Sequence, residues 1–257
     1  MDKAHSLIPY LTLARKEISR YLRIWQQTFF PPIITTSLYF VIFGNLIGKR
    51  IGEMDGYAYI DFIVPGLILM SIITNSYANV ASSFFGAKFQ SFIEEIMVSP
   101  TSHRIILLGY VTGGVTRGLL IGFLVSLVSL FFTDISIHSG LVVVSIALLT
   151  SVLFSLAGLL NGLFARSFDD VSIVPTFVLT PLTYLGGIFY SINLLPELWQ
   201  KISLINPILY MINAFRYGFL GISDINLTLS FTIIIVFIFV LGSWANYLLK
   251  NGYGIRN

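Results

Sequence analysis

The residues with the clearest capacity for chemistry lie in one short stretch, FFGAKFQSFIEEIMVSPTSHR, which runs from Phe84 to Arg104. It contains two adjacent glutamates, Glu94 and Glu95, with a lysine, a histidine and an arginine nearby. Paired carboxyl groups are typical of general acid–base catalysis, provided that both converge on one substrate. Adjacent residues of a helix diverge by about 100°, so these two glutamates would point apart. The pattern therefore predicts no catalytic pair.

The rest of the chain has no recognisable catalytic, metal or nucleotide motif. The three histidines, His5, His103 and His138, are too scattered to indicate a zinc site or a serine–histidine pair. GNLIGKR, residues 44–50, hints at a phosphate-binding loop, but that loop needs four residues between its glycines and a serine or threonine after its lysine. Here three residues separate the glycines, and Arg50 follows the lysine. We predict a chain that has no enzyme activity and binds no cofactor.

The composition indicates that lipid is the main solvent of this protein. The 257 residues have a mean hydropathy of +0.86, and only 11% are charged, against about 25% in soluble domains. A pI near 9.1 is compatible with nucleic-acid binding, but the net charge is only +3, so we expect no nucleic-acid partner. The first 28 residues hold five basic residues and no apolar core before a cleavage site, so they do not resemble a secretory signal.

Six stretches are apolar enough to cross a bilayer as helices, which takes about 20 residues each. They are residues 29–48, 60–84, 105–132, 141–164, 171–190 and 228–249. Pro175 and Pro181 should kink the fifth and shortest stretch. The sequence shows no repeat and no linker. It predicts a single all-α membrane domain over residues 1–257, with six transmembrane helices.

The basic residues predict how these helices are oriented. If the N-terminus is cytoplasmic, ten of the 15 lysines and arginines lie on the cytoplasmic side, four lie outside, and Arg117 lies within a span. Positively charged loops tend to remain inside. We therefore expect both termini in the cytoplasm.

Residues 5–27 have the pattern of an amphipathic helix. At 100° per residue, one face is apolar and the opposite face is basic. The apolar face holds Ala14, Ile18, Tyr21 and Trp25, and the basic face holds Lys16, Arg20 and Arg23. We expect this helix to lie in the membrane interface with its cations near anionic head groups. A solvated basic tail is the alternative.

The second span carries polar side chains on one helical stripe. Its members are Ser71, Thr74, Asn75, Asn79 and Ser82. Because amides and hydroxyls are costly in lipid, the stripe should face protein or a wet cavity. Helix packing and the lining of a transport path both fit this pattern.

Arg117 in the third span is the one cation that the sequence places inside the membrane. A central arginine costs at least about 2.5–3.5 kcal/mol, so it requires a partner. Gly113, Gly114 and Gly118 would let another helix come close. A structural ion pair or a contact with carbonyl groups is favoured over substrate contact. No span has an acid near its centre, which argues against a proton-coupled transporter.

Residues 85–104, between spans two and three, are better interpreted as a mechanical element. As a helix that stops near Pro100, this segment has an apolar face with Phe85, Phe89, Phe92, Ile93 and Ile96. Glu94 lies opposite that face. The apolar face should rest on the bundle while the two glutamates face a partner. A solvated loop helix is the alternative.

Residues 191–227 form the longest external segment and contain two further elements. LLPELWQKISLINP predicts a short amphipathic helix that opens at Pro196 and stops near Pro207. ILYMINAFRYGFLG is apolar but too short to span a bilayer. We expect it to re-enter the membrane, where such a segment must be buried in protein or line a cavity.

Residues 179–221, LTPLTYLGGIFYSINLLPELWQKISLINPILYMINAFRYGFLG, closely resemble the signature region of type-2 ABC exporter permeases. The shared features are a proline-kinked fifth span that ends in Gly-Gly, the Leu-Pro helix, Asn206 with Pro207, and Arg216 before the last span. Residues 62–90, FIVPGLILMSIITNSYANVASSFFGAKFQ, also resemble bacterial inner-membrane permeases of this family. The resemblance covers almost the whole chain.

The resemblance implies a homodimer in the bacterial inner membrane that works with two copies of a separate ATP-binding subunit, which holds the ATP and Mg²⁺. ATP-driven closure of those subunits would export an amphiphile such as a lipid, glycan or drug. Residues 85–104 would then be the coupling helix, which contacts the ATP-binding subunit through Phe89, Phe92, Glu94 and Glu95. The transport path would contain Asn75, Asn79, Thr176, Thr180 and Tyr184. A proton-coupled secondary transporter and a non-transporting membrane scaffold are the alternatives.

Overall fold

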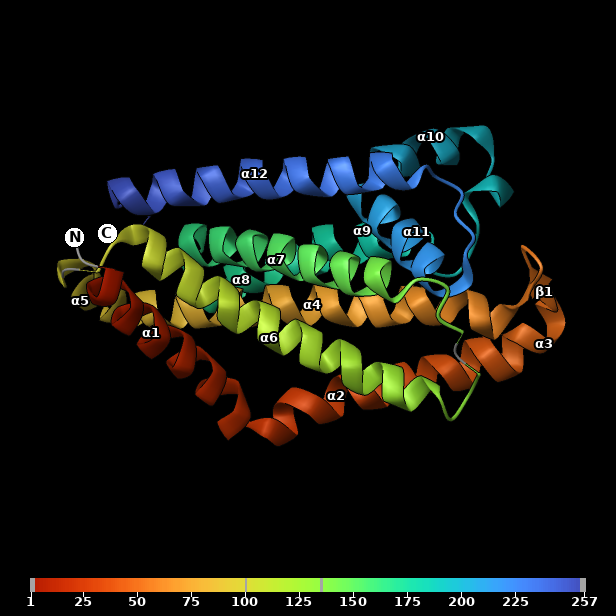
Figure 1. The fold of residues 1–257 in the computed structure, drawn as a ribbon, viewed down its shortest axis with the longest axis horizontal. Helices are drawn as coiled ribbons and strands as arrows, with labels where there is room; N and C mark the ends of the chain where they lie inside the picture. Colours follow the sequence, from red (N-terminus) through yellow and green to blue (C-terminus); the bar gives the residue numbers. More distant parts are fainter. Residues whose placement is uncertain (1–2, 100, 135, 255–257) are drawn as a thin grey trace.

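A computed structural model describes residues 3–99, 101–134 and 136–254 as an elongated bundle of helices (Figure 1). Within these described residues, five helical segments are long and apolar enough to cross a membrane. They are Trp25–Ile51, α4 (Tyr59–Phe89), α6 (His103–Ser129), α7 (Gly140–Phe164) and α12 (Leu227–Asn251). These segments correspond to the first, second, third, fourth and sixth predicted spans. The chain is mostly helical, as a membrane protein of this composition should be.

The predicted fifth span, residues 171–190, forms a shorter, interrupted helix. It consists of α8 (Phe168–Val174), the π-helical turn η2 (Pro175–Leu179) and α9 (Thr180–Tyr184). The carbonyl oxygen of Pro175 accepts from both the N–H and the hydroxyl of Thr180, five residues later, as expected where the α-helical ladder is interrupted. A capping box between Ser167 and Asp170 begins α8, and the backbone N–H of Arg166 lowers the pKa of Asp170 by donating to its carboxylate.

Helix α4 is the centre of the bundle. In its most apolar window 78% of the residues are buried, against 11% in the corresponding window of α12. Glycines let neighbouring helices approach it closely. Gly162 of α7 faces the α4 backbone, where a Cβ atom would lie 2.8 Å from the carbonyl oxygen of Ala81. Gly122 of α6 faces Ile72 of α4 in the same way, 2.5 Å from its Cγ1.

Helix α1 (Lys3–Arg23) covers the residues that were predicted to form an amphipathic helix, and it packs against α6 (Figure 1). Ala14 and Tyr21 of the predicted apolar face are buried, together with Leu13. Trp25 lies beyond α1, at the start of the first candidate span, and is 49% exposed. That span consists of α2 (Trp25–Tyr39), the π-helix η1 (Phe40–Ile47) and α3 (Gly48–Ile51).

The segment 85–104 is divided among the end of α4, the whole of α5 (Phe92–Val98) and the start of α6, which corrects the single helix predicted from Phe85 onward. Phe85 and Phe89 belong to the end of α4, and α5 begins after a sharp turn. Ser91 forms this turn in the left-handed region, with a φ of 57°, a conformation that costs a residue other than glycine about 1–2 kcal/mol. The predicted stop at Pro100 lies outside the described residues.

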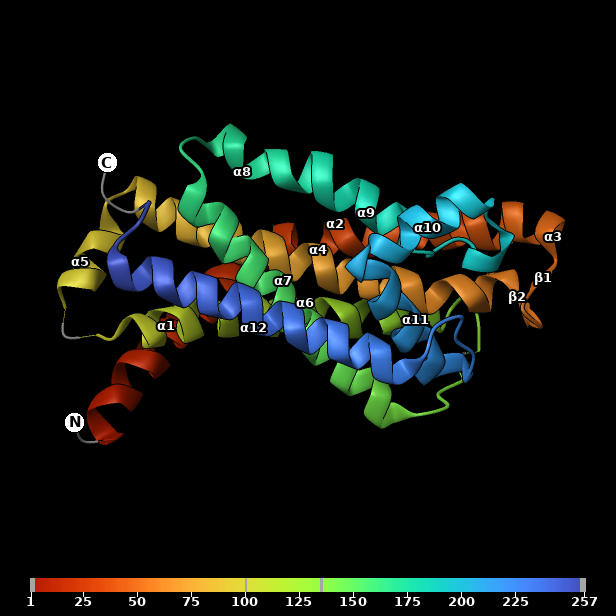
Figure 2. The ribbon, with the colours of Figure 1, turned by 90° about the horizontal axis from the view of Figure 1, so that it is seen from above.

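The opposite end of the bundle contains a small hairpin and two helices. Strands β1 (Glu53–Met54) and β2 (Tyr57–Ala58) are antiparallel, with Glu53 opposite Ala58. Asp55 and Gly56 connect them with positive φ angles, as a type I′ turn requires. This hairpin departs from the all-α prediction. Its position beside α3, far from α5, is visible in Figure 2, and the hydroxyl of Tyr57 donates to the carbonyl oxygen of Leu220 in α11.

The segment between α9 and α12 confirms the short helix predicted after Pro196. The 3₁₀ turn η3 (Ile192–Leu194) precedes α10 (Glu197–Ile205), and α11 (Pro207–Leu220) follows it. The side chain of Asn206 accepts from the N–H of Ile208, and Pro207 occupies the first helical position, where its missing N–H costs nothing. Most of α11 is buried between α4, α7 and α12. Entry of α11 into a membrane stays a prediction.

Candidate functional site

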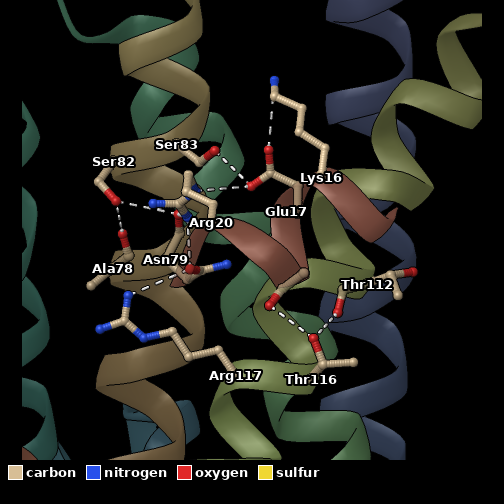
Figure 3. Close-up of polar contacts among 11 residues, drawn as sticks. Lys16, Glu17, Arg20, Ala78, Asn79, Ser82, Ser83, Thr112, Thr116 and Arg117 are labelled. Carbon is tan, nitrogen blue, oxygen red and sulfur yellow. Dashed lines mark hydrogen bonds and ion pairs between the residues drawn. The ribbon is translucent and has the colours of Figure 1, made fainter. Parts of the chain in front are cut away.

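A cluster of charged and amide side chains joins α1, α4 and α6 (Figure 3). We call it the polar cluster, and we define it by four residues. They are Glu17 and Arg20 of α1, Asn79 of α4 and Arg117 of α6. Asn79 and Arg117 were predicted from the sequence as polar residues within spans, whereas the role of Glu17 was not predicted.

Glu17 is a fully buried acid, with no exposed side-chain surface. The hydroxyl of Ser83 on α4 donates to its Oε2 at 2.6 Å, and the Nε of Arg20 lies 3.4 Å from the same oxygen. Lys16 Nζ lies 3.9 Å from the other carboxylate oxygen, Oε1. Gly113 of α6 makes room for this acid, because a Cβ atom there would lie only 2.5 Å from the Cβ of Glu17. A buried carboxylate needs such partners to offset its loss of water.

Arg20 and Arg117 converge on Asn79 from two sides (Figure 3). Nη2 of Arg20 donates to Oδ1 of Asn79 at 2.7 Å and to its backbone oxygen at 3.0 Å. Nη1 of Arg117 donates to the same Oδ1 at 3.4 Å, and its Nη2 donates to Oδ1 of Asn75 at 3.3 Å. Arg117 therefore has the partners that its position requires. They are neutral amide oxygens rather than an acid, so its charge is not neutralised.

The cations around this cluster outnumber the acids. Lys16, Arg20 and Arg117 are positive, and Glu17 is the one acid in contact with them among the described residues. Lys16 Nζ also lies 4.3 Å from the centre of the Phe92 ring of α5. Partial burial lowers the pKa of Lys16, although the nearby Glu17 opposes this shift. Helix α1 is thus tied to α4, α5 and α6 through charged side chains.

Arg20, which was predicted to lie on the basic face near lipid head groups, instead contacts Asn79 and Glu17 inside the bundle. The face of α1 that meets the bundle includes Leu13, Glu17, Arg20 and Tyr21, so it is turned toward one flank of the predicted apolar face. The remaining apolar side, with Leu7 and other exposed residues, is left for lipid. One sequence signal could have revealed the buried acid. Glu17 comes four residues before Tyr21 and three after Ala14, which places it beside the apolar face.

A groove of about 290 Å³ runs between α2 and α4, next to the polar cluster. Its lining residues are Pro31, Pro32, Thr35, Thr36, Tyr39, Leu67, Met70, Ser71, Thr74, Asn75 and Ala78. Thr36 of α2 and Ser71 of α4 share a hydrogen bond of 3.3 Å across it. Asn75 reaches both the groove and Arg117. The groove therefore adjoins the polar cluster.

The five predicted path residues occupy three different environments. Asn75 lines the α2–α4 groove, whereas Asn79 is completely buried and bound by two arginines. Thr176, Thr180 and Tyr184 are at least partly exposed along the interrupted fifth segment. The hydroxyl of Tyr184 lies 3.1 Å from that of Tyr39, which lines the groove. A transport role for these residues stays a prediction.

The four residues predicted to couple to an ATPase lie at the α5 end of the bundle. Glu94 and Glu95 are exposed on α5, and Phe92 is 39% exposed beneath Lys16. Phe89, at the end of α4, is 64% exposed and packs against Phe168 of α8, with ring centres 5.1 Å apart. Their contact with another protein stays a prediction.

Helix α5 is anchored by one buried side chain. Ile93 is fully buried in a hydrophobic cluster to which α1, α4, α6, α7 and α12 all contribute. A second groove, of about 380 Å³, separates α5 from α1. Ile8, Leu13, Lys16, Ile96 and Glu95 are among its lining residues. A displacement of α5 would thus disturb the packing of several spans at once.

The signature residue Arg216 is 1% exposed at the other end of the bundle. Its Nη2 donates to the carbonyl oxygen of Gly187 at 2.6 Å and its Nε to that of Phe62 at 3.3 Å. The guanidinium also lies 3.8 Å from the centre of the Phe62 ring. Asn206 bridges the same region by donating to the carbonyl of Leu182 at 2.6 Å. The Gly-Gly turn, α4 and α11 are joined here by side chains that reach backbone carbonyls.

No group of three or more metal-ligating side chains occurs among the residues that the structure describes. The side chains of the polar cluster and the α2–α4 groove can make hydrogen bonds, and the cations of the cluster can attract anions.

Comparison with known proteins finds the family to which these features belong. The family model described as "ABC-2 type transporter" matches residues 9–220. The inner membrane transport permease YadH of Escherichia coli (strain K12) is 61% identical over 244 residues, which cover 94% of each chain. Nodulation protein J of Sinorhizobium fredii is 25% identical over 182 residues, which cover 70% of this chain and 69% of that protein. Nodulation protein J of Rhizobium meliloti is also 25% identical, over 185 residues that cover 72% of this chain and 71% of that protein.

Proposed function

Because this chain belongs to the ABC-2 type transporter family, we propose that it works as the membrane subunit of an ATP-driven exporter. The family makes it a permease subunit of an ABC transporter, a multi-pass inner-membrane protein that works with a separate ATP-binding subunit. Our proposal adds outward transport, an amphiphilic cargo such as a lipid, glycan or drug, a homodimeric permease, and cytoplasmic termini. The α5 end of the bundle then faces the cytoplasm.

The arrangement of α5 is the observation that carries this proposal. Ile93 anchors the helix in a cluster built from five other helices, and Glu94 and Glu95 remain exposed. Helices that are short, exposed on one face and rigidly anchored on the other can receive a force and pass it to the bundle, because packed cores deform little. We assign α5 the role of coupling helix. Phe89 and Phe92 would add apolar contacts to the ATP-binding subunit beside the two glutamates.

The α2–α4 groove and the fifth segment support the proposed path. The groove has hydroxyl and amide groups on apolar walls, as a site for an amphiphile should. Thr176, Thr180 and Tyr184 are at least partly exposed in a single copy of the chain, and the Tyr39–Tyr184 contact connects their face with the groove. We infer that a second copy encloses these polar residues, together with Asn75. Asn79 would then lie outside the path and influence it by positioning Arg20 and Arg117.

The test is reconstitution of this chain with its ATP-binding subunit in lipid vesicles. We expect the two proteins to copurify, with ATP hydrolysis that depends on the permease. Failure to associate in both detergent and nanodiscs would contradict the proposed function.

Charge reversal at α5 tests the coupling contact. The double change Glu94→Arg and Glu95→Arg should abolish most transport and weaken association with the ATP-binding subunit, because it places cations where a basic partner surface is expected. The fold should persist, since both side chains are exposed. Glu53→Arg with Glu197→Arg makes the same charge change at exposed positions of the opposite end and is the matched control. Full transport and association in the α5 variant would rule out the assignment.

A further inference from the structure

The α2–α4 groove adjoins a concentration of positive charge that the protein does not neutralise. Asn75 lines the groove and accepts from Arg117, and Ala78 lines it immediately before Asn79, which accepts from Arg20. The groove's own lining has no charged side chain among the described residues. One guanidinium group is therefore bonded to an asparagine that lines the groove, and the other to an asparagine that directly follows a lining residue.

The two arginines share an acceptor that is too weak to hold them as an acid would. Arg20 and Arg117 donate to the same neutral oxygen, Oδ1 of Asn79, at 2.7 and 3.4 Å. Like charges this close repel each other, and an amide dipole offsets this less well than an anion. Glu17 contacts Arg20 but makes no contact with Arg117 in the described chain.

The other surrounding helices provide no acid that could neutralise these two arginines. Helices α2, α6 and α7 have no aspartate or glutamate, and the one acid in α4 is Asp61 at its far end. Asp61 is engaged there with the hydroxyl of Thr133. The positive charge is therefore available for a ligand that approaches from the groove.

The rest of the groove suits an apolar chain. Leu67, Met70, Pro31 and Pro32 give it apolar walls, and hydroxyls such as those of Thr35 and Thr36 are spaced between them. Its volume of about 290 Å³ lies near the small end of ligand pockets. A ligand matched to this site has a compact anionic head group on an apolar tail.

We propose that the cargo held in the α2–α4 groove is an anionic amphiphile, whose phosphate-like head group is bound by Arg20 and Arg117. This proposal rests on the proposed export function and specifies its substrate class. Arginine is suited to the task because its fork of N–H groups can bind phosphate oxygens in pairs. The amide oxygens of Asn75 and Asn79 hold the arginines in place while the site is empty and release them to the head group.

The first experiment measures binding to the permease alone, without the ATP-binding subunit. The chain is placed in phosphatidylcholine nanodiscs and exposed to a photoreactive dodecyl phosphate or to the matching dodecyl maltoside, and the labelled peptides are mapped. We expect dodecyl phosphate to label the peptide containing Met70 and Ala78. Inorganic phosphate should compete poorly, because it lacks the tail. Equal labelling of this peptide by the maltoside would overturn the anionic assignment.

Two variants make the test specific to the cluster. Arg20→Gln with Arg117→Gln should weaken apparent affinity for dodecyl phosphate by about tenfold or more and leave the maltoside unaffected. Arg15→Gln with Arg23→Gln removes the same charge from exposed positions of α1 and should have little effect. An equal loss of dodecyl phosphate affinity in both variants would mean that surface charge in general attracts the anion, and it would overturn the proposal.

A third variant keeps both arginines and guards against loss of folding. Asn79→Asp has nearly the same shape and places a carboxylate where the two guanidinium groups meet. We expect it to raise thermal stability and to lower dodecyl phosphate affinity as strongly as the double arginine change. Unchanged affinity in the Asn79→Asp variant would contradict the proposal.

The last arm separates cargo from resident lipid and from failure of the proposed function. In the complex with the ATP-binding subunit, ATP should move fluorescent phosphatidylglycerol between leaflets faster than phosphatidylcholine. Anionic binding that ATP turnover never converts into movement would identify a resident lipid and overturn the cargo assignment. ATP-driven movement of phosphatidylcholine alone would overturn this proposal and leave the exporter intact.

Discussion

The chain buries Arg216 at the hairpin end of its bundle and half-buries Arg117 at the middle of α6, and the two sites hold these arginines differently. At the hairpin end, Arg216 is bound by the backbone carbonyls of Phe62 and Gly187 and by the Phe62 ring. At the middle of α6, the hydrogen bonds of Arg117 within the described chain go to the side-chain oxygens of Asn75 and Asn79. Backbone carbonyls are fixed by the helix or turn that contains them, whereas amide side chains can rotate.

The difference separates a structural site from an adjustable one. Arg216 joins α4, the Gly187 turn and α11 into one unit, and Gly187 has a φ of 78° that favours glycine. Arg117 can exchange its neutral amide partners for an anion at small cost. We therefore expect stability to depend on the first arginine and ligand binding on the second.

Replacement of each arginine by methionine should give the largest difference in stability between the two sites. Arg216→Met leaves two carbonyl oxygens without their buried donor and opens a cavity, so it should cost about 3–5 kcal/mol of stability. Arg117→Met should cost about 1 kcal/mol or less, since the repulsion with Arg20 disappears with it. Thermal unfolding of both variants in the same detergent checks this. Equal losses would show that the two sites are alike.

Loss of the buried acid should have the next largest effect. Glu17→Gln removes the one carboxylate in contact with Lys16 and Arg20 in the described chain but keeps an oxygen for Ser83, so we expect a loss of about 1–3 kcal/mol. In a double-mutant cycle, Asn79→Asp should recover part of this loss, because it returns a negative charge to Arg20. The readout is thermal unfolding. Strict additivity would show that the two positions are independent.

A single methyl group tests the close approach of α1 to α6. Gly113→Ala would place its Cβ 2.5 Å from that of Glu17, so we expect α1 to shift and stability to fall by about 1–2 kcal/mol. Gly86→Ala is the matched control, because nothing lies within 4 Å of its Cβ position, and it should be neutral or stabilising. A crosslink between cysteines introduced on α1 and α6 should weaken only in the first variant.

The smallest expected effect concerns the turn before α5. Ser91 has a φ of 57°, so Ser91→Gly should relieve backbone strain in the folded state. Glycine also raises the conformational entropy of the unfolded chain, which cancels part of this gain. We expect a gain of roughly 0.5 kcal/mol, with coupling of ATP hydrolysis to transport unchanged. Ser91→Val should lower stability, because a β-branched residue is disfavoured in this conformation. A stabilised Ser91→Val variant would show that the turn is not strained.

Much of the fold could be predicted because lipid imposes a simple rule on sequence. Long apolar runs gave the positions of five spans within a few residues, and Pro175 gave the interruption of the fifth segment. Pro196 and Pro207 gave the two ends of α10, and Asn206 caps the following α11 by ordinary capping chemistry. The turn at Ser91 was missed, since serine has no preference for positive φ that the sequence could reveal.

The polar cluster was less predictable because its partners come from different helices. The requirement that Arg117 have a partner followed from its position alone, but the identity of Asn75 and Asn79 as partners depends on how α4 and α6 pack. The sequence assigned no role to Glu17, and only the contact of α1 with Gly113 places it inside. Local periodicity can predict the apolar face of a helix, whereas the burial of residues beside that face depends on the helix that packs against it.

The most direct test of the account is the energy source of transport. Inside-out vesicles that contain the permease, its ATP-binding subunit and fluorescent phosphatidylglycerol or phosphatidylcholine in the outer leaflet are treated with dithionite, which bleaches label that has not moved inward. We predict that ATP protects the label of at least one probe, that a protonophore does not change this, and that a hydrolysis-deficient ATP-binding subunit abolishes it. Movement that needs no ATP and follows an imposed proton gradient would contradict the account.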